Sequence, residues 1–348
     1  MFSLERAGRW FLASGIQEAS GGVARYYRID RGANAPVSTE ITGYACEAFL
    51  YLAGRTGQAE YRTAALRAGR FLTGCAWDAR IGALPFEWPA NGAALAYFFD
   101  CGIVSRALHA LWREEPEPEF IDTARACAAS MARDFRDGSC WHAVIDLPGK
   151  RPLPAEPRWS RQPGCYQLKA ALAWLQAGDY AHYEAQRALA LAGDASFLPG
   201  ADEPGRVVDR LHAYLYYLEG LLPSLGDAEC RNALASGIVR AAVAARQHRG
   251  VYERSDVYAQ LLRIRLYADR LGVLPLDMAA AAEEAAAIPE FQMSSWDPRI
   301  DGCVAFGRAA GTLLPYANPV STAFAIQACE MWSDYQAGRF QPDWRELI

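Results

Sequence analysis

The sequence predicts an all-α protein in which six inner helices are surrounded by six outer helices in a single domain, residues 1–348. The first observation is a helical stretch at residues 38–54, where small and apolar side chains cover nearly every face, as in a helix buried all round. The second is a one-sided amphipathic helix that follows after a short turn. The third is the recurrence of this pair along the chain, which is typical of a repeat architecture.

The first buried helix has the signals expected at both of its ends. Ser38 or Thr39 can cap its N-terminus, and Gly54 can end it. Its polar side chains, among them Glu40 and Tyr44, gather in the first turns. The sequence therefore predicts an apolar helix whose polar N-terminal end faces a functional site.

Five further buried helices follow the same design. They are predicted to begin near Asp100, Cys165, Asp209, Asp256 and Ser321. The amphipathic helices that follow the first five buried helices are predicted at residues 60–75, 120–135, 180–192, 228–246 and 276–287. No amphipathic helix follows the sixth, so the N-terminal helix, residues 4–15, is its expected partner and closes the ring.

The segments that lead into the buried helices are long and rich in Trp, Pro, Gly and Arg, whereas the returning turns are short. In repeat architectures the face that carries such insertions is usually the binding face. We therefore expect the functional site at the end of the ring where the buried helices begin.

Composition and charge exclude several classes of protein. The net charge of -5 comes from scattered charges of both signs, which argues against a nucleic-acid partner. The nine cysteines are widely spaced, and most lie in apolar runs, so they are expected to be free; Cys46, Cys101, Cys127 and Cys329 should be buried and unpaired.

No CxxC pair, Walker loop, GxSxG or HExxH motif is present, so neither a metal nor a cofactor is expected. No apolar run reaches the length of a membrane span, and no signal peptide is evident. The expected location is cytoplasmic, and the oligomeric state is left open.

Three helix starts, residues 39–44, 99–102 and 318–323, are similar to the inner-helix starts of carbohydrate-active (α/α)6 toroids, including unsaturated glucuronyl hydrolases and sugar epimerases. As architecture the resemblance covers nearly the whole chain, and it assigns no specific family. It implies an (α/α)6 toroid and an enzyme acting on a saccharide or uronic-acid oligosaccharide, as a hydrolase, lyase or epimerase.

A polar residue stands near the start of each buried helix. These residues are Glu40, Asp100, Gln162, Asp209, Asp256 and Ser321. Each can be an ordinary helix cap, but six caps at the same end of the ring would also line a common cavity. Glycosidic chemistry needs a proton-donating acid and a second carboxylate. Asp100 is the preferred donor because the aromatic run 97–99 can raise its pKa, and Glu40 and Asp209 are candidates for the second carboxylate.

His212 lies three residues after Asp209 and therefore on the same helix face, with Tyr216 one turn further on. A histidine in this place can act as the general acid or base that a sugar epimerase requires. The alternative is a histidine hydrogen-bonded within the ring for structural reasons.

Aromatic and charged residues near the helix starts complete the candidate site. Indole rings stack on the apolar faces of sugars, and guanidinium groups bind carboxylates. The expected substrate-binding residues are Tyr44, Glu87, Trp88, Trp141, Trp159, Tyr216, Asp256, Trp296 and Arg308. The alternative for each Trp is packing of a loop onto the ring.

Two other functions stay open at this point. A terpenoid-cyclase-like enzyme of this fold would act on an apolar substrate, but its Asp-x-Asp-Asp motif is missing. A noncatalytic toroid that binds a glycan or a protein is the second alternative. The partner expected for the leading interpretation is a small-molecule or oligosaccharide substrate.

Overall fold

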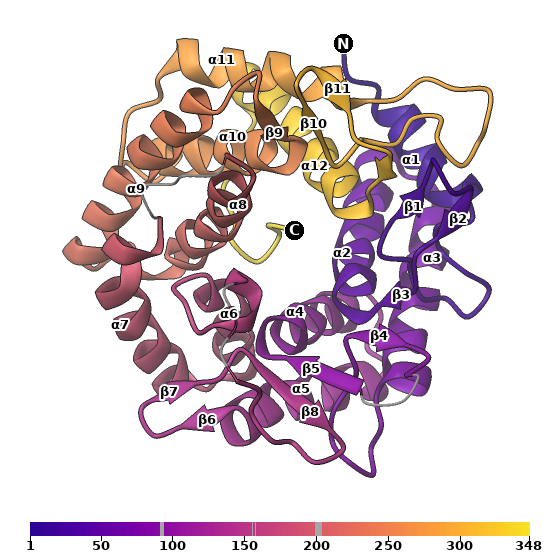
Figure 1. Ribbon diagram of the computed structural model, residues 1–348, viewed down its shortest axis with the longest axis vertical. Coiled ribbons are helices and arrows are strands. Elements are labelled where there is room, and N and C mark those ends of the chain that lie inside the picture. Colours follow the sequence, from indigo (N-terminus) through magenta and orange to yellow (C-terminus); the bar gives the residue numbers. More distant parts are fainter. Residues whose placement is uncertain (91–93, 155, 157, 199–203) are drawn as a thin grey trace. The chain divides into compact units, whose positions relative to one another are not determined.

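The computed structural model describes residues 1–90, 94–154, 156, 158–198 and 204–348 (Figure 1). Within these residues it contains twelve α-helices and twelve short strands of two to four residues. The prediction of a helical protein with twelve main helices is thus confirmed. The chain divides into two compact units, one made of residues 1–16, 26–34 and 195–348, and the other of residues 17–25 and 35–194.

The second of these units, called here the α2–α6 unit, shows the expected alternation of buried and one-sided helices. Its inner helices α2 (Thr39–Thr56), α4 (Phe98–Glu114) and α6 (Gln167–Ala177) pack in sequence, α2 on α4 and α4 on α6. The outer helices are α3 (Ala59–Phe71), α5 (Pro118–Asp134) and α7 (Tyr180–Phe197). The last three residues of α7 lie beyond residue 194, where this unit ends. The inner helices are buried along most of their length because apolar residues occupy every face.

The other unit, called here the α8–α12 unit, repeats the pattern. Its inner helix α10 (Ser255–Arg270) packs against α8 (Pro204–Gly220) and α12 (Pro319–Gln336). Its outer helices are α9 (Ala228–Gln247), α11 (Met278–Ala287) and α1 (Leu4–Ala13). Helix α1 packs against α12, as expected if the N-terminal helix is the partner of the sixth inner helix.

Short antiparallel strands fill the long segments that lead into the inner helices. In the α2–α6 unit the pairs are β3 (Val37–Ser38) with β4 (Glu87–Trp88), β5 (Ala94–Tyr97) with β8 (Val144–Leu147), and β6 (Arg136–Asp137) with β7 (Cys140–Trp141). In the α8–α12 unit, β10 (Gly307–Ala309) lies between β9 (Tyr252–Arg254) and β11 (Thr312–Leu313), and β1 (Tyr27–Arg28) between β2 (Ala33–Asn34) and β12 (Tyr316–Ala317). Because β3, β5 and β9 run directly into α2, α4 and α10, the first turns of these helices are anchored by a strand.

The helix starts correct the interpretation of the six polar residues as caps. Glu40 and Asp256 occupy the second helical position, and Asp100 and Ser321 the third, so all four lie inside a first turn. The residues at the cap positions of these four helices are Ser38, Tyr97, Arg254 and Asn318. The two remaining candidates also miss the cap position, because Gln162 precedes α6 by five residues and Asp209 follows the start of α8 by five.

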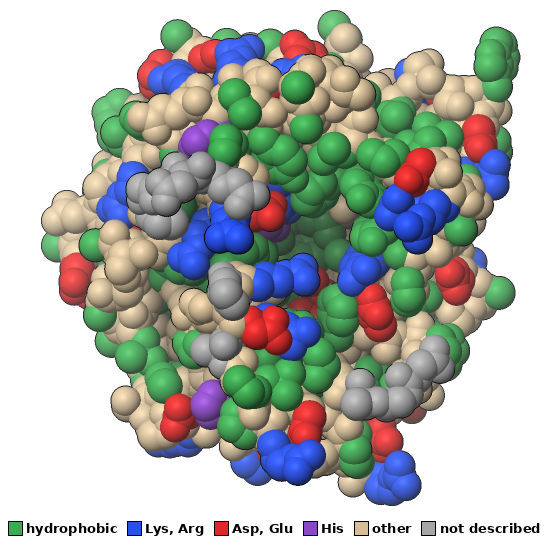
Figure 2. All heavy atoms as spheres, viewed as in Figure 1, with side chains coloured by type: hydrophobic (Ala, Val, Ile, Leu, Met, Phe, Trp, Pro, Cys, Tyr) green, Lys and Arg blue, Asp and Glu red, His purple; other side chains and the backbone are tan. Residues whose placement is uncertain are grey.

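The thiols and the surface charges follow the expectations from composition. All nine cysteines are free, and Cys46, Cys101 and Cys127 are buried as predicted, whereas Cys329 is only half-buried. Positive and negative side chains are interspersed over the face shown in Figure 2. No helix among the described residues is long and apolar enough to cross a membrane.

Candidate active site

Asp100 is the most unusual carboxyl group of the α2–α6 unit. It lies in the first turn of α4 with 4 % of its surface exposed, and its Oδ2 has no hydrogen-bond partner among the described residues. Burial raises the pKa of Asp100 well above its usual range, and the negative charge of Glu40 raises it further. Both effects favour the neutral, proton-bearing form of this carboxyl group.

Glu40 is half-buried in the first turn of α2, the helix that packs against α4. Its negative charge is near enough to Asp100 to raise the pKa of that carboxyl group. The structure therefore brings together Asp100 and one of the two candidates for a second carboxylate.

An aromatic wall stands beside Asp100. The Tyr166 ring lies 5.8 Å from the Phe99 ring and 5.0 Å from the Trp159 ring, and the Tyr166 hydroxyl donates to the Gln162 carbonyl at 3.0 Å. Burial and the neighbouring Asp100 raise the pKa of Tyr166, so the phenol stays neutral. Trp159 is half-buried and thus keeps part of its indole accessible.

Lys169 is a buried cation that sequence reasoning did not single out. It is fully buried in the first turn of α6, and its Nζ lies 5.4 Å from the centre of the Tyr44 ring. Tyr44, which was expected at the site, is buried on α2. The signal for Lys169 was available, because a charged residue within the apolar run of α6 is rarely placed there without a partner or a function.

The remaining candidates of this unit have structural partners. Glu87 forms an ion pair with Arg25 at 2.9 Å, and half-buried Trp88 packs edge-on against Phe71 at 5.2 Å. Trp141 is 3 % exposed and lies 5.0 Å from the ring of Trp174. The stacking role predicted for Trp141 does not fit this burial, because a sugar ring needs an exposed indole face.

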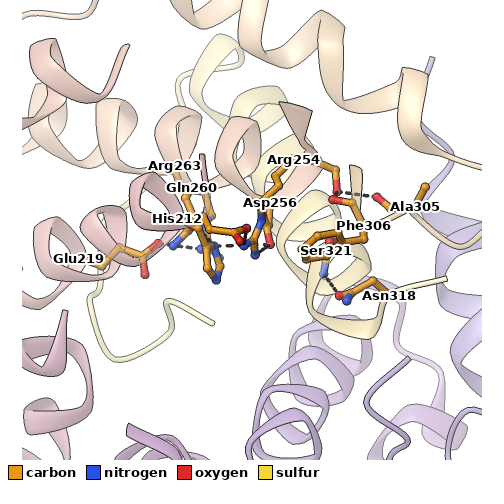
Figure 3. A network of polar contacts seen from close by, with 12 residues as sticks. His212, Glu219, Arg254, Asp256, Gln260, Arg263, Ala305, Phe306, Asn318 and Ser321 are labelled. Atoms are coloured by element: carbon orange, nitrogen blue, oxygen red, sulfur yellow. Dashed lines mark hydrogen bonds and ion pairs between the residues drawn. The ribbon is translucent and has the colours of Figure 1, made fainter. Parts of the chain in front are cut away.

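His212 is the centre of a polar network in the α8–α12 unit (Figure 3). Its Nδ1 lies 2.7 Å from Oε1 of Gln260 and 3.5 Å from Oδ2 of Asp256, and both partners stand on α10. Because an amide oxygen and an ionised carboxylate only accept hydrogen bonds, Nδ1 carries the proton and Nε2 holds the lone pair. In this neutral form Nε2 is the basic nitrogen of the ring.

Arg254 joins two carboxylates of the same network. Its Nε and Nη2 donate to Asp256 at 3.0 and 2.6 Å, and its Nη1 donates to Asp209 at 2.9 Å. The guanidinium group also lies 4.3 Å from the centre of the Phe306 ring. Burial alone would raise the pKa of Asp256, but the charge of Arg254, together with that of His212 whenever its ring is protonated, outweighs burial and holds that pKa below its ordinary value.

A second polar layer lies further along the same helices. Arg263 and Glu219 are buried and form an ion pair at 2.7 Å, and Arg263 also donates to Gln327 at 2.8 Å. The spacing explains this placement. His212, Tyr216 and Glu219 on α8, and Asp256, Gln260 and Arg263 on α10, recur at four and three residues, so each set shares one helix face. The rings of His212 and Tyr216 are 4.5 Å apart.

The last three candidates, Asp209, Arg308 and Trp296, lie in the α8–α12 unit. The Asp209 side chain is 44 % exposed and ion-paired with Arg254, so it belongs to the His212 network. Arg308 binds two carboxylates of the protein, Glu253 at 2.8 Å and Glu290 at 2.6 Å, and Trp296 is fully exposed.

The structure thus sorts the candidates into two clusters. Glu40, Tyr44, Asp100 and Trp159 gather around the first turns of the α2–α6 unit, and Asp209, His212, Tyr216 and Asp256 gather in the α8–α12 unit. Sequence reasoning missed Lys169 in the first cluster, and Gln260 in the second. Among the described residues, no group of His, Cys, Asp and Glu side chains is arranged to hold a metal ion.

Comparison with known proteins identifies the fold. No protein-family model and no curated protein matches the chain. Solved structures are similar over nearly the whole length. The cellobiose 2-epimerase of Spirochaeta thermophila is 15% identical, with 94% of this chain and 95% of that one covered and a TM-score of 0.67. The cellobiose 2-epimerase of Bacillus thermoamylovorans is 12% identical over 93% and 95%, with a TM-score of 0.69.

The unsaturated glucuronyl hydrolase of a Bacillus species is 13% identical over 95% of this chain and 97% of that one, with a TM-score of 0.65. At such identities the likeness establishes the fold and not the activity. The predicted (α/α)6 toroid is confirmed.

Proposed function

We propose that the protein is a carbohydrate-active enzyme that cleaves a glycosidic bond of a saccharide, with Asp100 as the proton donor. The observation that carries this proposal is the burial of the Asp100 carboxyl group beside Glu40, which raises the pKa of Asp100. Glycosidic cleavage needs a carboxylic acid that protonates the leaving oxygen and a carboxylate that activates water or attacks the sugar. Glu40 is our candidate for the second role.

The surroundings of Asp100 support a saccharide as the substrate. Trp159 packs edge-on against the buried Tyr166 ring and is itself only half-buried, and an accessible indole ring can stack on the apolar face of a sugar. The solved structures with this fold include enzymes whose names refer to sugars, which supports the class by analogy.

A second candidate function, isomerisation or epimerisation of a sugar, is favoured by the state of His212. With Nδ1 donating to Gln260, its Nε2 is the basic nitrogen that can remove a proton next to a carbonyl group. Two of the similar solved structures are cellobiose 2-epimerases, which supports this candidate by analogy.

The two candidates are separated by one experiment with matched variants. Purified protein, Asp100→Asn and His212→Asn are incubated with neutral and uronic-acid oligosaccharides. Chain cleavage is followed by mass spectrometry, and products of unchanged mass by NMR. The surface variant Asp122→Asn on α5 is the control.

If the glycosidic proposal is right, Asp100→Asn lowers turnover by about two to four orders of magnitude, the usual contribution of a positioned acid or base. Its melting temperature should stay close to that of Asp122→Asn. If Asp100→Asn instead lowers stability, while the protein that remains folded keeps its turnover, Asp100 is a structural residue and not the proton donor. Products of unchanged mass, lost in His212→Asn, would favour the second candidate.

A further inference from the structure

Arg254 and Asp256 stand two residues apart where β9 passes into α10. Arg254 is the cap residue of α10 in an extended conformation, and Asp256 is in the first turn. This geometry directs the guanidinium group back onto the carboxylate, which it binds through two hydrogen bonds of 3.0 and 2.6 Å. Both side chains are buried, so neither charge is screened by water.

Arg254 and His212 compete for the same carboxylate. Asp256 Oδ2 lies 2.6 Å from Arg254 Nη2 but 3.5 Å from His212 Nδ1, whose nearer partner is Gln260 at 2.7 Å. A buried carboxylate requires a counter-charge, and guanidinium supplies one permanently, whereas imidazole must first bind a proton.

From this arrangement we infer that Arg254 is a positioning residue, which supplies the counter-charge of Asp256 and so leaves His212 neutral, with its proton on Nδ1. The inference rests on the acid–base role proposed for His212. A base must be unprotonated before it accepts a proton from a substrate, so Arg254 would set the pH range in which His212 works.

The charges within this unit support the inference. The charged or titratable groups around His212 come from its own helix α8 (Asp209, Tyr216, Glu219), from β9 (Tyr252, Arg254) and from α10 (Asp256, Arg263). Helix α12 contributes the uncharged Phe324 ring at 6.5 Å, and α9 packs on another face of α8, where Arg240 lies over Tyr214.

The charged groups among them are three carboxylates and two arginines, and burial raises the pKa of Tyr252 to about 12, so that its phenol is neutral. Arg263 already forms an ion pair with Glu219, at 2.7 Å. Loss of Arg254 would leave Asp209 and Asp256 without their shared cation, and His212 is then the group that can replace it. The pKa of His212 should therefore rise in Arg254→Met, by about one to three pH units.

The test is an NMR titration of the full chain with 15N-labelled histidine. The protein has five histidines, so the other four serve as internal references. In the wild type at pH 8, His212 should show the Nδ1-protonated neutral form. In Arg254→Met its titration should move to higher pH, and in Arg254→Lys, which restores the charge, it should return toward the wild type.

The chain contains a matched control. Arg28 binds Asp30, also two residues further on, through Nε at 2.7 Å and Nη2 at 2.5 Å, and its guanidinium lies 5.0 Å from the Tyr316 ring. Unlike Arg254, this pair is partly exposed, so Arg28→Met should leave the titration of His212 unchanged.

An unchanged or lowered pKa of His212 in Arg254→Met overturns the inference, as does a wild-type ring protonated on Nε2. If Arg254→Met does not fold, Arg254→Lys provides the test. The inference requires that His212 in this variant keep the neutral form with its proton on Nδ1, and the same NMR measurement shows whether it does. The titration needs no substrate. Full activity of His212→Asn would therefore refute the role proposed for His212, and it would leave the measured effect of Arg254 standing.

Discussion

Asp100 and Asp256 are the same residue type in first turns of inner helices, yet their pKa values shift in opposite directions. Asp100 is buried beside Glu40 and has a raised pKa, whereas Asp256 is buried beside Arg254 and has a lowered one. The sequence predicted the shift of Asp100 from its aromatic neighbours. The structure attributes it first to burial and then to Glu40, a residue on another helix that local sequence cannot identify.

His109 provides a prediction at the same scale. It is 6 % exposed, and its pKa is lowered to about 4, first by burial and then by Arg113 and Arg125. The folded state thus binds fewer protons than the unfolded state between pH 6.5 and 4. The stability that depends on neutral His109 is complete above pH 6.5 and is lost as the pH falls toward 4.

In His109→Gln, the stability lost on going from pH 7 to pH 4.5 should therefore be smaller than in the wild type, by about 1 to 3 kcal/mol. Urea denaturation at both pH values measures this difference, and half-buried His248→Gln is the control. An equal loss in wild type and His109→Gln would show that the histidine titrates alike in both states.

At the scale of elements, the helices were more predictable than their starts. Burial on all faces or on one face follows from the spacing of apolar residues, which the sequence displays. The start of α8 was placed at Asp209 because aspartate is a common cap, although the helix begins at Pro204. Proline at the first helical position was the better signal, since it lacks the N–H that would go unpaired there.

The close approach of α4 and α6 gives a prediction for two packed elements. A Cβ atom on Gly102 would lie 2.5 Å from both the Cβ and the carbonyl oxygen of Ala170, so Gly102→Ala must push the helices apart. We expect a loss of about 1 to 3 kcal/mol in unfolding free energy, typical of overpacking. Chemical denaturation measures it.

Gly54 in α2 is the matched control, because a Cβ atom added there would meet no other atom within 4 Å. Gly54→Ala should be neutral or stabilise by up to about 1 kcal/mol through helix propensity. Equal stability of the two variants would mean that α4 and α6 adapt without strain.

For the whole molecule, sequence periodicity predicted the toroid, and the single-domain organisation stays a prediction. Most residues of the two polar clusters can be named from the sequence, but their pairing cannot. The ion pair of Arg254 with Asp209 joins positions 45 residues apart, and that of Arg263 with Glu219 joins positions 44 apart. Such contacts depend on which helices become neighbours and which faces meet, and a single sequence does not display either.

The thiols give a prediction that involves the whole chain. All nine cysteines are free; Cys75 is exposed, and Cys140 and Cys329 are half-buried. The other six are buried, and burial raises the pKa of Cys46, Cys101 and Cys127, which lowers their thiolate content and hence their reactivity. In the folded protein a thiol reagent should therefore react fastest at Cys75. In denaturant without reductant it should count nine thiols per chain. A lower count would mean that cysteines distant in this structure are paired, and it would contradict the packing of the inner helices.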